Sequence, residues 1–229
     1  MDSFREVPVP EGTARTKSAR ACKDRGIDSC RRDVTASWGR HRINLVPLIP
    51  LANGAGSAAP NPEPELSTLE HVAASLARTF RTPCRIRHDS FDVSFSRDAG
   101  RNQYHSTAII QKLERAADPD ARVLGVTACD LYVPVLTFVF GEAQLDGNCA
   151  VVSTARLKEE FYGLPRREEL FLERLIKEAA HELGHTFGLR HCMDWRCVMA
   201  SSHAVERLDV KGAEFCKSCR KTVLEDGYW

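Results

Sequence analysis

The segment 181–191 reads HELGHTFGLRH and limits the possible folds and functions of this chain more than any other segment. At about 100° per helical residue, His181 and His185 lie about 40° apart on one face, so their ring nitrogens can converge on one ion. Apolar residues upstream cluster on the opposite face and predict that this side is buried. Gly188 suits the left-handed turn that ends a helix and lets His191 return. The segment predicts a long helix, about residues 167–187, that ends at a metal site.

The residue types in this segment point to zinc chemistry. Three neutral imidazoles, from His181, His185 and His191, leave one position open on a tetrahedral Zn²⁺ ion. Glu182 lies about 100° from His181 on the helical wheel, beside the metal but not ligating it. There its carboxylate can act as a general base toward water, whose pKa zinc lowers to about 7. Surface histidines on an amphipathic helix, the alternative, explain neither Gly188 nor the third histidine.

Nine cysteines form the second pattern. The odd number excludes a fully paired disulfide framework within one chain. Four of them fall in the last fifth of the chain with the spacing of metal ligands: Cys192, Cys197, Cys216 and Cys219. The alternative is a set of ordinary thiols or disulfides. Cys129 and Cys149 stand in apolar strand patterns and are expected to be buried thiols.

Charge and composition set the limits of the domain. Residues 1–42 carry ten Lys/Arg against six Asp/Glu and have few large apolar residues, so we expect a disordered basic extension there. The remainder, 43–229, is expected to be one domain. A net charge of +1 gives no whole-protein field that favours nucleic acid. No apolar run approaches the roughly 20 residues of a membrane span.

The periodicity along the domain predicts an alternation of strands and helices. Strands are expected at 43–49, 122–131, 136–140 and 149–154, with the turn signal Asp146-Gly147 making a hairpin of the last two. Residues 84–95 are expected to be extended. Helices are expected after a capping box of Ser67 and Glu70, and at 106–116 and 167–187. This order favours a mixed α/β sheet over a doubly wound repeat.

The pattern HExxHxxGxxH resembles that of the metzincin zinc peptidases. Its continuation through Cys192, Cys197, Met199 and the pair Cys216 and Cys219 resembles one family among them, the archaemetzincins. The resemblance extends over about 43–226. It implies an α/β (α+β) metzincin-like fold: a mixed, mostly parallel twisted sheet with packed helices and an active-site helix that carries HExxH. A C-terminal four-cysteine zinc-bound subdomain, about 192–226, would complete it.

The resemblance also implies roles for individual residues. His181, His185 and His191 would hold a catalytic zinc, and Glu182 would be the general base. Met199 would lie under that zinc in the Met-turn, whereas the alternative is an ordinary core methionine. The four cysteines would close the shell of a second, structural zinc. Residues 136–143 would form an upper-rim strand that binds substrate, or an ordinary edge strand. Several other metzincins have a tyrosine after the Met-turn, but here Ser201, Ser202 and His203 follow.

The resulting hypothesis is a zinc-dependent peptidase of the archaemetzincin type with two zinc ions and a peptide or protein substrate. The alternative is a catalytically silent zinc-binding module that binds peptides or regulates. A four-cysteine knuckle for nucleic acid lacks interleaved aromatic and basic residues around 192–219. We expect a cytoplasmic monomer, with no nucleic-acid or membrane partner.

Overall fold

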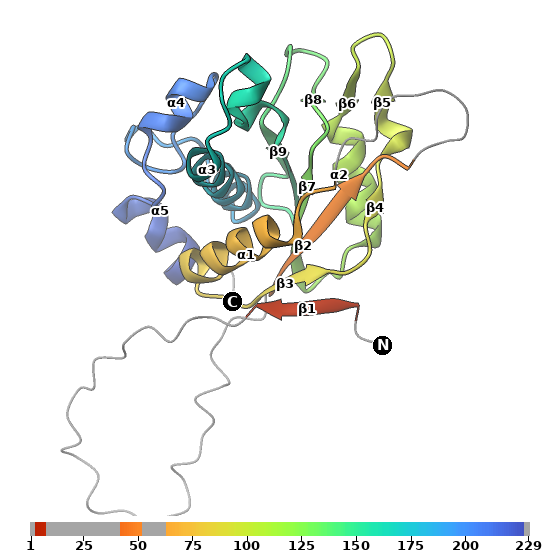
Figure 1. Ribbon diagram of the computed structural model, residues 1–229. Helices are drawn as coiled ribbons and strands as arrows, with labels where there is room; N and C mark the ends of the chain where they lie inside the picture. Colours follow the sequence, from red (N-terminus) through yellow and green to blue (C-terminus); the bar gives the residue numbers. More distant parts are fainter. Residues whose placement is uncertain (1–2, 8–41, 52–62, 227–229) are drawn as a thin grey trace, which may run out of the picture.

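A seven-stranded mixed sheet organises the molecule (Figure 1). The computed structural model describes residues 3–7, 42–51 and 63–226. The strand order is β1-β3-β2-β7-β10-β9, and β4 pairs with β2 beyond this path. Strands β3, β2, β7 and β10 run parallel, whereas the outer strands β1 and β9 are antiparallel to their neighbours. The sheet is therefore mixed, as the order of elements predicts, and mostly parallel, as the resemblance to the metzincins implies.

The strands are short and the central ones are buried. The bounds in the main sheet are β1 Phe4–Val7, β2 Arg42–Ile49, β3 Cys84–Arg87, β4 Phe91–Asp92, β7 Ala121–Thr127, β9 Gly141–Ala143 and β10 Cys149–Ser153. A small second sheet joins β5 Arg97–Asp98, β6 Gln103–His105 and β8 Leu131–Tyr132. All five residues of β10 are buried, as are six consecutive residues of β2. Such continuous burial is typical of parallel strands that are covered on both faces.

Helices cover the two faces of the sheet unequally. Helices α1 (Leu66–Phe80) and α3 (Glu168–Thr186) lie on one face, and α2 (Ser106–Ala116) lies on the other (Figure 1). Two apolar clusters, one on each face, form the core. The short helices α4 (Val205–Val210) and α5 (Lys217–Lys221) follow α3 and close the C-terminal side. Single-turn helices at Ser94–Ser96, Ala155–Leu157, Glu159–Tyr162 and Thr222–Asp226 link these elements.

Two helices, one hairpin and two buried thiols agree with the sequence-based expectations, whereas the start of α1 does not. Helices α2 and α3 fill the ranges expected for them, and β9 with β10 makes the expected hairpin. The burial of Cys129 and Cys149 is confirmed. The capping box is wrong, because the N-cap of α1 is Glu65, two residues before Ser67, and it makes no side-chain cap bond.

The strand expected at 136–140 is also wrong. This segment turns and bends, and only Val139 forms an isolated bridge, to Leu131. Its aromatic residue Phe138 packs edge-on against Phe140 and beneath the guanidinium of Arg156, 4.1 Å from the ring centre. The edge strand expected over 136–143 therefore forms only at Gly141–Ala143. Side-chain packing, not a strand ladder, accounts for Phe138 and Phe140, whereas Leu136 is exposed.

The expectation of a disordered extension over 1–42 is wrong for residues 4–7. Residues 4–7 form β1, which pairs with β3 in the register Phe4 with Arg87 and Val7 with Cys84. The disordered extension expected for 1–42 does not include them. Residues 8–41 lie outside the described part of the chain. Among the described residues, no helix has the length and apolar character needed to cross a membrane.

Candidate metal centre

The last two turns of α3 bring two histidines and a glutamate into the protein interior. His181 is 4 % exposed and Glu182 5 % exposed, while His185 is half-buried. The helix is held in place by Leu175, Ala179 and Leu183, which are buried in the core cluster on the α1 and α3 face of the sheet. The packing of this apolar side determines where the histidines point.

Backbone carbonyl groups orient both helix histidines. The Nδ1 of His181 lies 2.9 Å from the carbonyl oxygen of Val198, and the Nδ1 of His185 lies 2.7 Å from that of Leu189. A carbonyl oxygen only accepts, so in each ring Nδ1 carries the proton and Nε2 keeps its lone pair. The two Nε2 atoms lie 3.2 Å apart. Two lone pairs that face each other at this distance favour a cation between them.

The chain reverses direction directly after α3 and brings the third histidine, His191, back toward His181 and His185. Gly188 adopts φ +80°, which confirms the left-handed conformation that the sequence predicts. The ring centre of His191 lies 5.3 Å from that of His181 and 5.1 Å from that of His185. One ring nitrogen from each of the three lies within 4.8 Å of the others. His191 is exposed, so the cluster opens to solvent on its side.

This donor set fits zinc. Tetrahedral Zn²⁺ with nitrogen ligands at 2.0–2.1 Å places two such nitrogens about 3.3 Å apart, close to the observed 3.2 Å. Burial lowers the pKa of His181 well below its ordinary value, and the charge of Lys211 lowers it further. Burial also lowers the pKa values of His185 and His191. All three rings are therefore neutral near pH 7, the form that binds a metal.

Glu182 is enclosed by groups that come from three other places in the chain. A Cβ added to Gly141 on β9 would stand 2.6 Å from Cγ and 2.8 Å from Oε1 of Glu182, so only glycine allows this approach. Glu178, one turn earlier, hydrogen-bonds to Glu182 and lies 3.5 Å from the Nζ of Lys211. Burial, followed by the Glu178 charge, raises the pKa of Glu182 well above its ordinary value.

The Met199 side chain packs against α3 and is shielded from solvent. Its side chain is fully buried, and its Sδ and Cε atoms occupy the space beside Gly184, where a Cβ would stand 3.1 Å from Cε. The turn that carries Met199 is tied to the histidine segment, because the Cys192 amide donates to the Met199 carbonyl at 2.9 Å. The adjacent carbonyl of Val198 orients His181. This turn therefore holds His181 in position and packs against α3.

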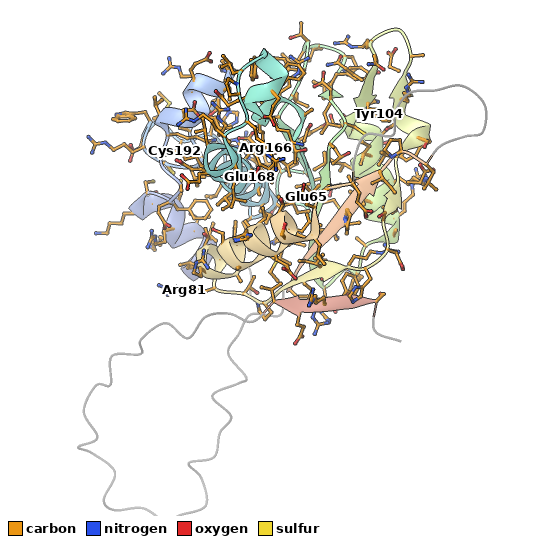
Figure 2. The ribbon with its side chains drawn as sticks, viewed as in Figure 1. Glu65, Arg81, Tyr104, Arg166, Glu168 and Cys192 are labelled. Carbon is orange, nitrogen blue, oxygen red and sulfur yellow. The ribbon has the colours of Figure 1, made fainter. Side chains whose placement is uncertain are left out.

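The four C-terminal cysteines also converge. Their Sγ atoms all lie within 4.8 Å of one another, and those of Cys192 and Cys216 are 3.8 Å apart. That separation is too long for a disulfide, about 2.05 Å, and matches the roughly 3.8 Å between thiolates on tetrahedral zinc. The backbone amide of Cys219 hydrogen-bonds the Cys216 thiol and lowers its pKa, which favours the thiolate. In Figure 2, Cys192 lies on the side of α3 away from the sheet.

Arg122 on β7 holds the C-terminal end of α3. Its guanidinium donates to the carbonyl oxygens of Thr186 and Gly147, and stacks 3.9 Å from the ring centre of Phe187. The Asp146 amide donates to the His185 carbonyl at 3.0 Å. The hairpin turn and β7 thus satisfy carbonyl groups that the helix end leaves unpaired.

Sequence reasoning found the seven metal-binding candidates and Met199 but missed several supporting residues. Gly141, Glu178, Lys211 and Arg122 stand outside the motif, and no local spacing signals their position. Gly184 could have indicated a close contact in the sequence, because a glycine inside a helix lowers helix stability by about 1 kcal/mol and usually has a packing reason. The tertiary structure supplies that reason in Met199.

A buried helix that offers two imidazoles, a third imidazole beyond a sharp turn, and a carboxylate beside them together define the class of zinc metallopeptidases. Residues 83–225 match the family model described as Peptidase family M54. The chain belongs to this family.

The relatives agree with this assignment. An archaemetzincin of Methanocaldococcus jannaschii is 45 % identical over 129 residues, which cover 56 % of this chain and 70 % of the relative. The crystal structure of archaemetzincin from Methanopyrus kandleri has a TM-score of 0.65 and 33 % identity, and the match covers 83 % of this chain and 96 % of that one. A zinc-dependent peptidase from Methanocorpusculum labreanum matches with a TM-score of 0.67 and 28 % identity, over 80 % and 99 %.

Proposed function

We propose that the protein hydrolyses peptide bonds with a catalytic zinc held by His181, His185 and His191 and with Glu182 as general base. The observation that carries this proposal is the pair of Nε2 atoms, 3.2 Å apart, whose rings are fixed through Nδ1 by backbone carbonyls. Such fixed tautomers are typical of metal-ligating histidines. When bound, zinc supplies Lewis acidity toward water and the substrate carbonyl.

Glu182 is the proton carrier in this proposal. Its carboxylate takes a proton from the attacking water and passes it to the leaving amine nitrogen. Gly141 lets β9 pass directly against the Glu182 side chain and limits its rotamers. β9 is the last strand of the sheet order, and among the described residues only β10 pairs with it. We propose that an extended peptide adds to the free edge of β9 through backbone hydrogen bonds.

The cysteine cluster has a structural role in the proposal. Cys192 and Cys197 come from the loop after α3, and Cys216 and Cys219 from the start of α5. Four thiolates complete a tetrahedral shell and leave no position open for substrate. A second zinc here joins the loop that begins at His191 to the C-terminal helices.

The test compares Glu182→Gln with Glu173→Gln, a matched change on an exposed face of the same helix. We expect Glu182→Gln to keep its zinc and lose at least about 100-fold in peptide hydrolysis, because the base is removed and the ligands remain. Glu173→Gln should hydrolyse peptides like the parent. Wild-type turnover in Glu182→Gln contradicts the general-base role. If the zinc-loaded parent cleaves no member of a peptide library, the silent zinc-binding module is favoured.

A further inference from the structure

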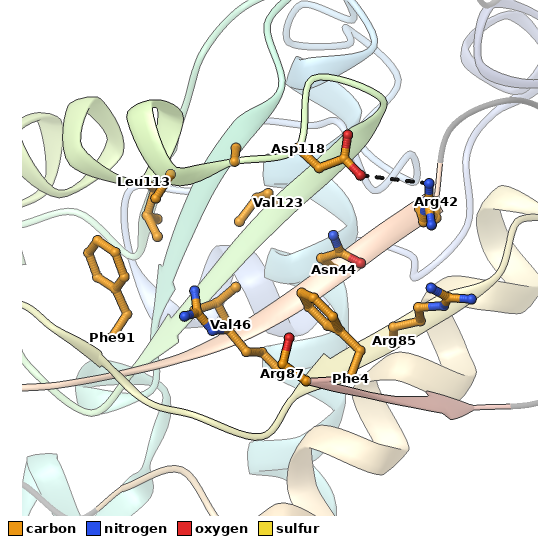
Figure 3. Close-up of a pocket in the computed structure, with 13 residues that line it drawn as sticks. Phe4, Arg42, Asn44, Val46, Arg85, Arg87, Phe91, Leu113, Asp118 and Val123 are labelled. Carbon is orange, nitrogen blue, oxygen red and sulfur yellow. Dashed lines mark ion pairs between the residues drawn. The ribbon is translucent and has the colours of Figure 1, made fainter. Parts of the chain in front are cut away.

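Three charged side chains are buried together beside α3, and the proposed hydrolysis uses only one of them. Glu178, Glu182 and Lys211 are 4 %, 5 % and 3 % exposed. The ion pair of Arg42 with Asp118, shown in Figure 3, is different, because these side chains are 43 % and 44 % exposed. An exposed pair loses little hydration, whereas moving a charge from water into the interior costs several kcal/mol. The burial of Glu178 and Lys211 therefore requires a reason.

The two glutamates form a hydrogen-bonded pair on one face of the helix. Glu178 and Glu182 are four residues apart on α3, the spacing at which side chains on a helix meet. Their carboxyl groups hydrogen-bond to each other. Ionised carboxylates only accept hydrogen bonds, so this bond contains a proton that belongs to the pair. The bond replaces the repulsion of two like charges with an attraction that fixes one group against the other.

Lys211 reaches this pair from the segment that follows α4. Its Nζ atom lies 3.5 Å from Oε2 of Glu178 and donates to the carbonyl oxygen of Ala200 at 3.4 Å. Ala200 directly follows Met199, whose turn packs against α3. The ammonium group balances the negative charge that the two carboxyl groups retain. Lys211 therefore ties Glu178 to the methionine turn.

Steric contact alone does not fix the Glu182 carboxyl group. Gly141 on β9 lies against the Glu182 side chain and limits where it can stand. The last torsion of a glutamate is nevertheless broad, so the plane of the carboxyl group can still rotate. A hydrogen bond from Glu178 to one oxygen removes this freedom. The other oxygen then keeps a defined direction.

A purely structural role is the alternative, and Lys177 is an example of it. Lys177 is 3 % exposed, and its Nζ donates to the carbonyl oxygens of Leu208 and Asp209, both at 3.2 Å. It thus joins α3 to the C-terminal end of α4. Buried ion pairs stabilise proteins little compared with apolar residues of similar volume. Stability alone therefore does not account for Lys211 and its contact with Glu178.

We propose that Glu178 is a positioning residue for Glu182: it holds one oxygen of the Glu182 carboxyl group by a hydrogen bond, and Lys211 holds Glu178 in place. This role rests on the proposed function of Glu182 as general base. The fixed carboxyl group directs its second oxygen to the attacking water. Loss of Glu178 misaligns the base without touching the edge of β9, so turnover falls while substrate binding stays.

The test compares two double variants of the zinc-loaded full chain. Both contain Lys211→Met, so neither leaves a buried ammonium without its partner. In Glu178→Gln/Lys211→Met the side-chain amide still donates to Glu182, whereas Glu178→Leu/Lys211→Met has no donor there. We expect both variants to keep their zinc. The kcat of the leucine variant should be at least about tenfold below that of the glutamine variant, with KM within about twofold. A merely structural role would change both variants alike, so equal kcat values overturn the proposal.

Acetohydroxamate gives a second measurement that needs no hydrolysis. A hydroxamate binds a metal through its oxygens and donates a hydrogen bond to a carboxylate beside the metal, so its Kd reports the position of Glu182. By calorimetry, the leucine variant should bind acetohydroxamate at least about threefold more weakly than the glutamine variant. Equal Kd values refute the positioning role even if turnover differs. If the parent binds acetohydroxamate but cleaves no peptide, the proposed hydrolysis fails and these two Kd values alone decide the role of Glu178.

Lys177→Met is the control for a lysine that only joins two helices. It removes the donor to the carbonyls of Leu208 and Asp209, so its melting temperature should fall. Its kcat, measured below that temperature, should stay within about twofold of the parent, because neither carbonyl belongs to the Glu178 and Glu182 pair. A loss of kcat in Lys177→Met as large as that in the leucine variant would assign the effect to a loosened α4 and refute the proposal.

Discussion

Gly184 and Met199 are packed so closely that a methyl group on the glycine would collide with the methionine sulfur. The glycine lies between the two helix histidines, and the methionine is in the turn whose neighbouring carbonyl, that of Val198, orients His181. The contact therefore couples the helix to the turn that orients His181.

Gly184→Ala should destabilise the protein and displace the Met199 turn. The alanine gains about 1 kcal/mol of helix propensity, but overpacking a core contact costs roughly 1–3 kcal/mol, so the steric cost prevails. Denaturant unfolding of Gly184→Ala, Met199→Ala and the double variant measures the coupling between them. The double variant should be less destabilised than the sum of the single changes, because the new methyl group enters space that Met199 has left. Additive effects would mean that the two residues do not constrain each other.

The protein should bind two zinc ions with separable roles. His185→Ala and Cys216→Ser should each lose about one zinc by metal analysis, and Cys149→Ala, a buried thiol outside both clusters, should keep both. Only Cys216→Ser should become sensitive to proteolysis within 192–226, because thiolate-bound zinc contributes on the order of 10 kcal/mol to folding of small domains. A single zinc in the parent protein contradicts the two-site proposal.

Arg122→Met should weaken the end of α3. The methionine keeps much of the apolar contact with Phe187 but leaves the carbonyls of Thr186 and Gly147 without their donor. We expect a loss of about 2–3 kcal/mol in the free energy of unfolding, together with weaker zinc binding at the histidines. Arg122→Lys, which keeps a positively charged donor, should lose less stability than Arg122→Met. Arg115→Met on the exposed face of α2 is the control and should stay within about 0.5 kcal/mol. Equal stability of both methionine variants would rule out this capping role.

Deleting residues 1–7 should lower stability without abolishing hydrolysis. The deletion uncovers the edge of β3 and removes the ion pairs of Arg5 with Glu70 and of Glu6 with Arg85, each worth up to about 1 kcal/mol at the surface. We expect a loss of about 1–3 kcal/mol, measured by thermal unfolding at fixed zinc concentration. An unchanged melting temperature would show that β1 adds nothing to the sheet.

Local patterns located most elements, and the failures have physical causes. The 3.6-residue period fitted α2 and α3 because one face of each packs against the sheet. The apolar run at 136–140 looked like a strand, but Phe138 packs on Arg156, which is far along the chain, and only Val139 bridges to another strand. Residues 4–7 looked like part of a tail, because nothing in four residues shows that β3 offers an edge for pairing.

The sequence by itself determined the two clusters of candidate metal-binding residues. Helix geometry places residues four apart on one face, a glycine permits the reversal that returns His191, and four thiols at close spacing can meet. Only the tertiary structure decided what surrounds them. Gly141 lies against Glu182, and Lys211 pairs with Glu178, because the strand order and the return of the chain after α4 bring together residues that are many positions apart. Such contacts depend on the packing of the whole domain, and no local spacing encodes them.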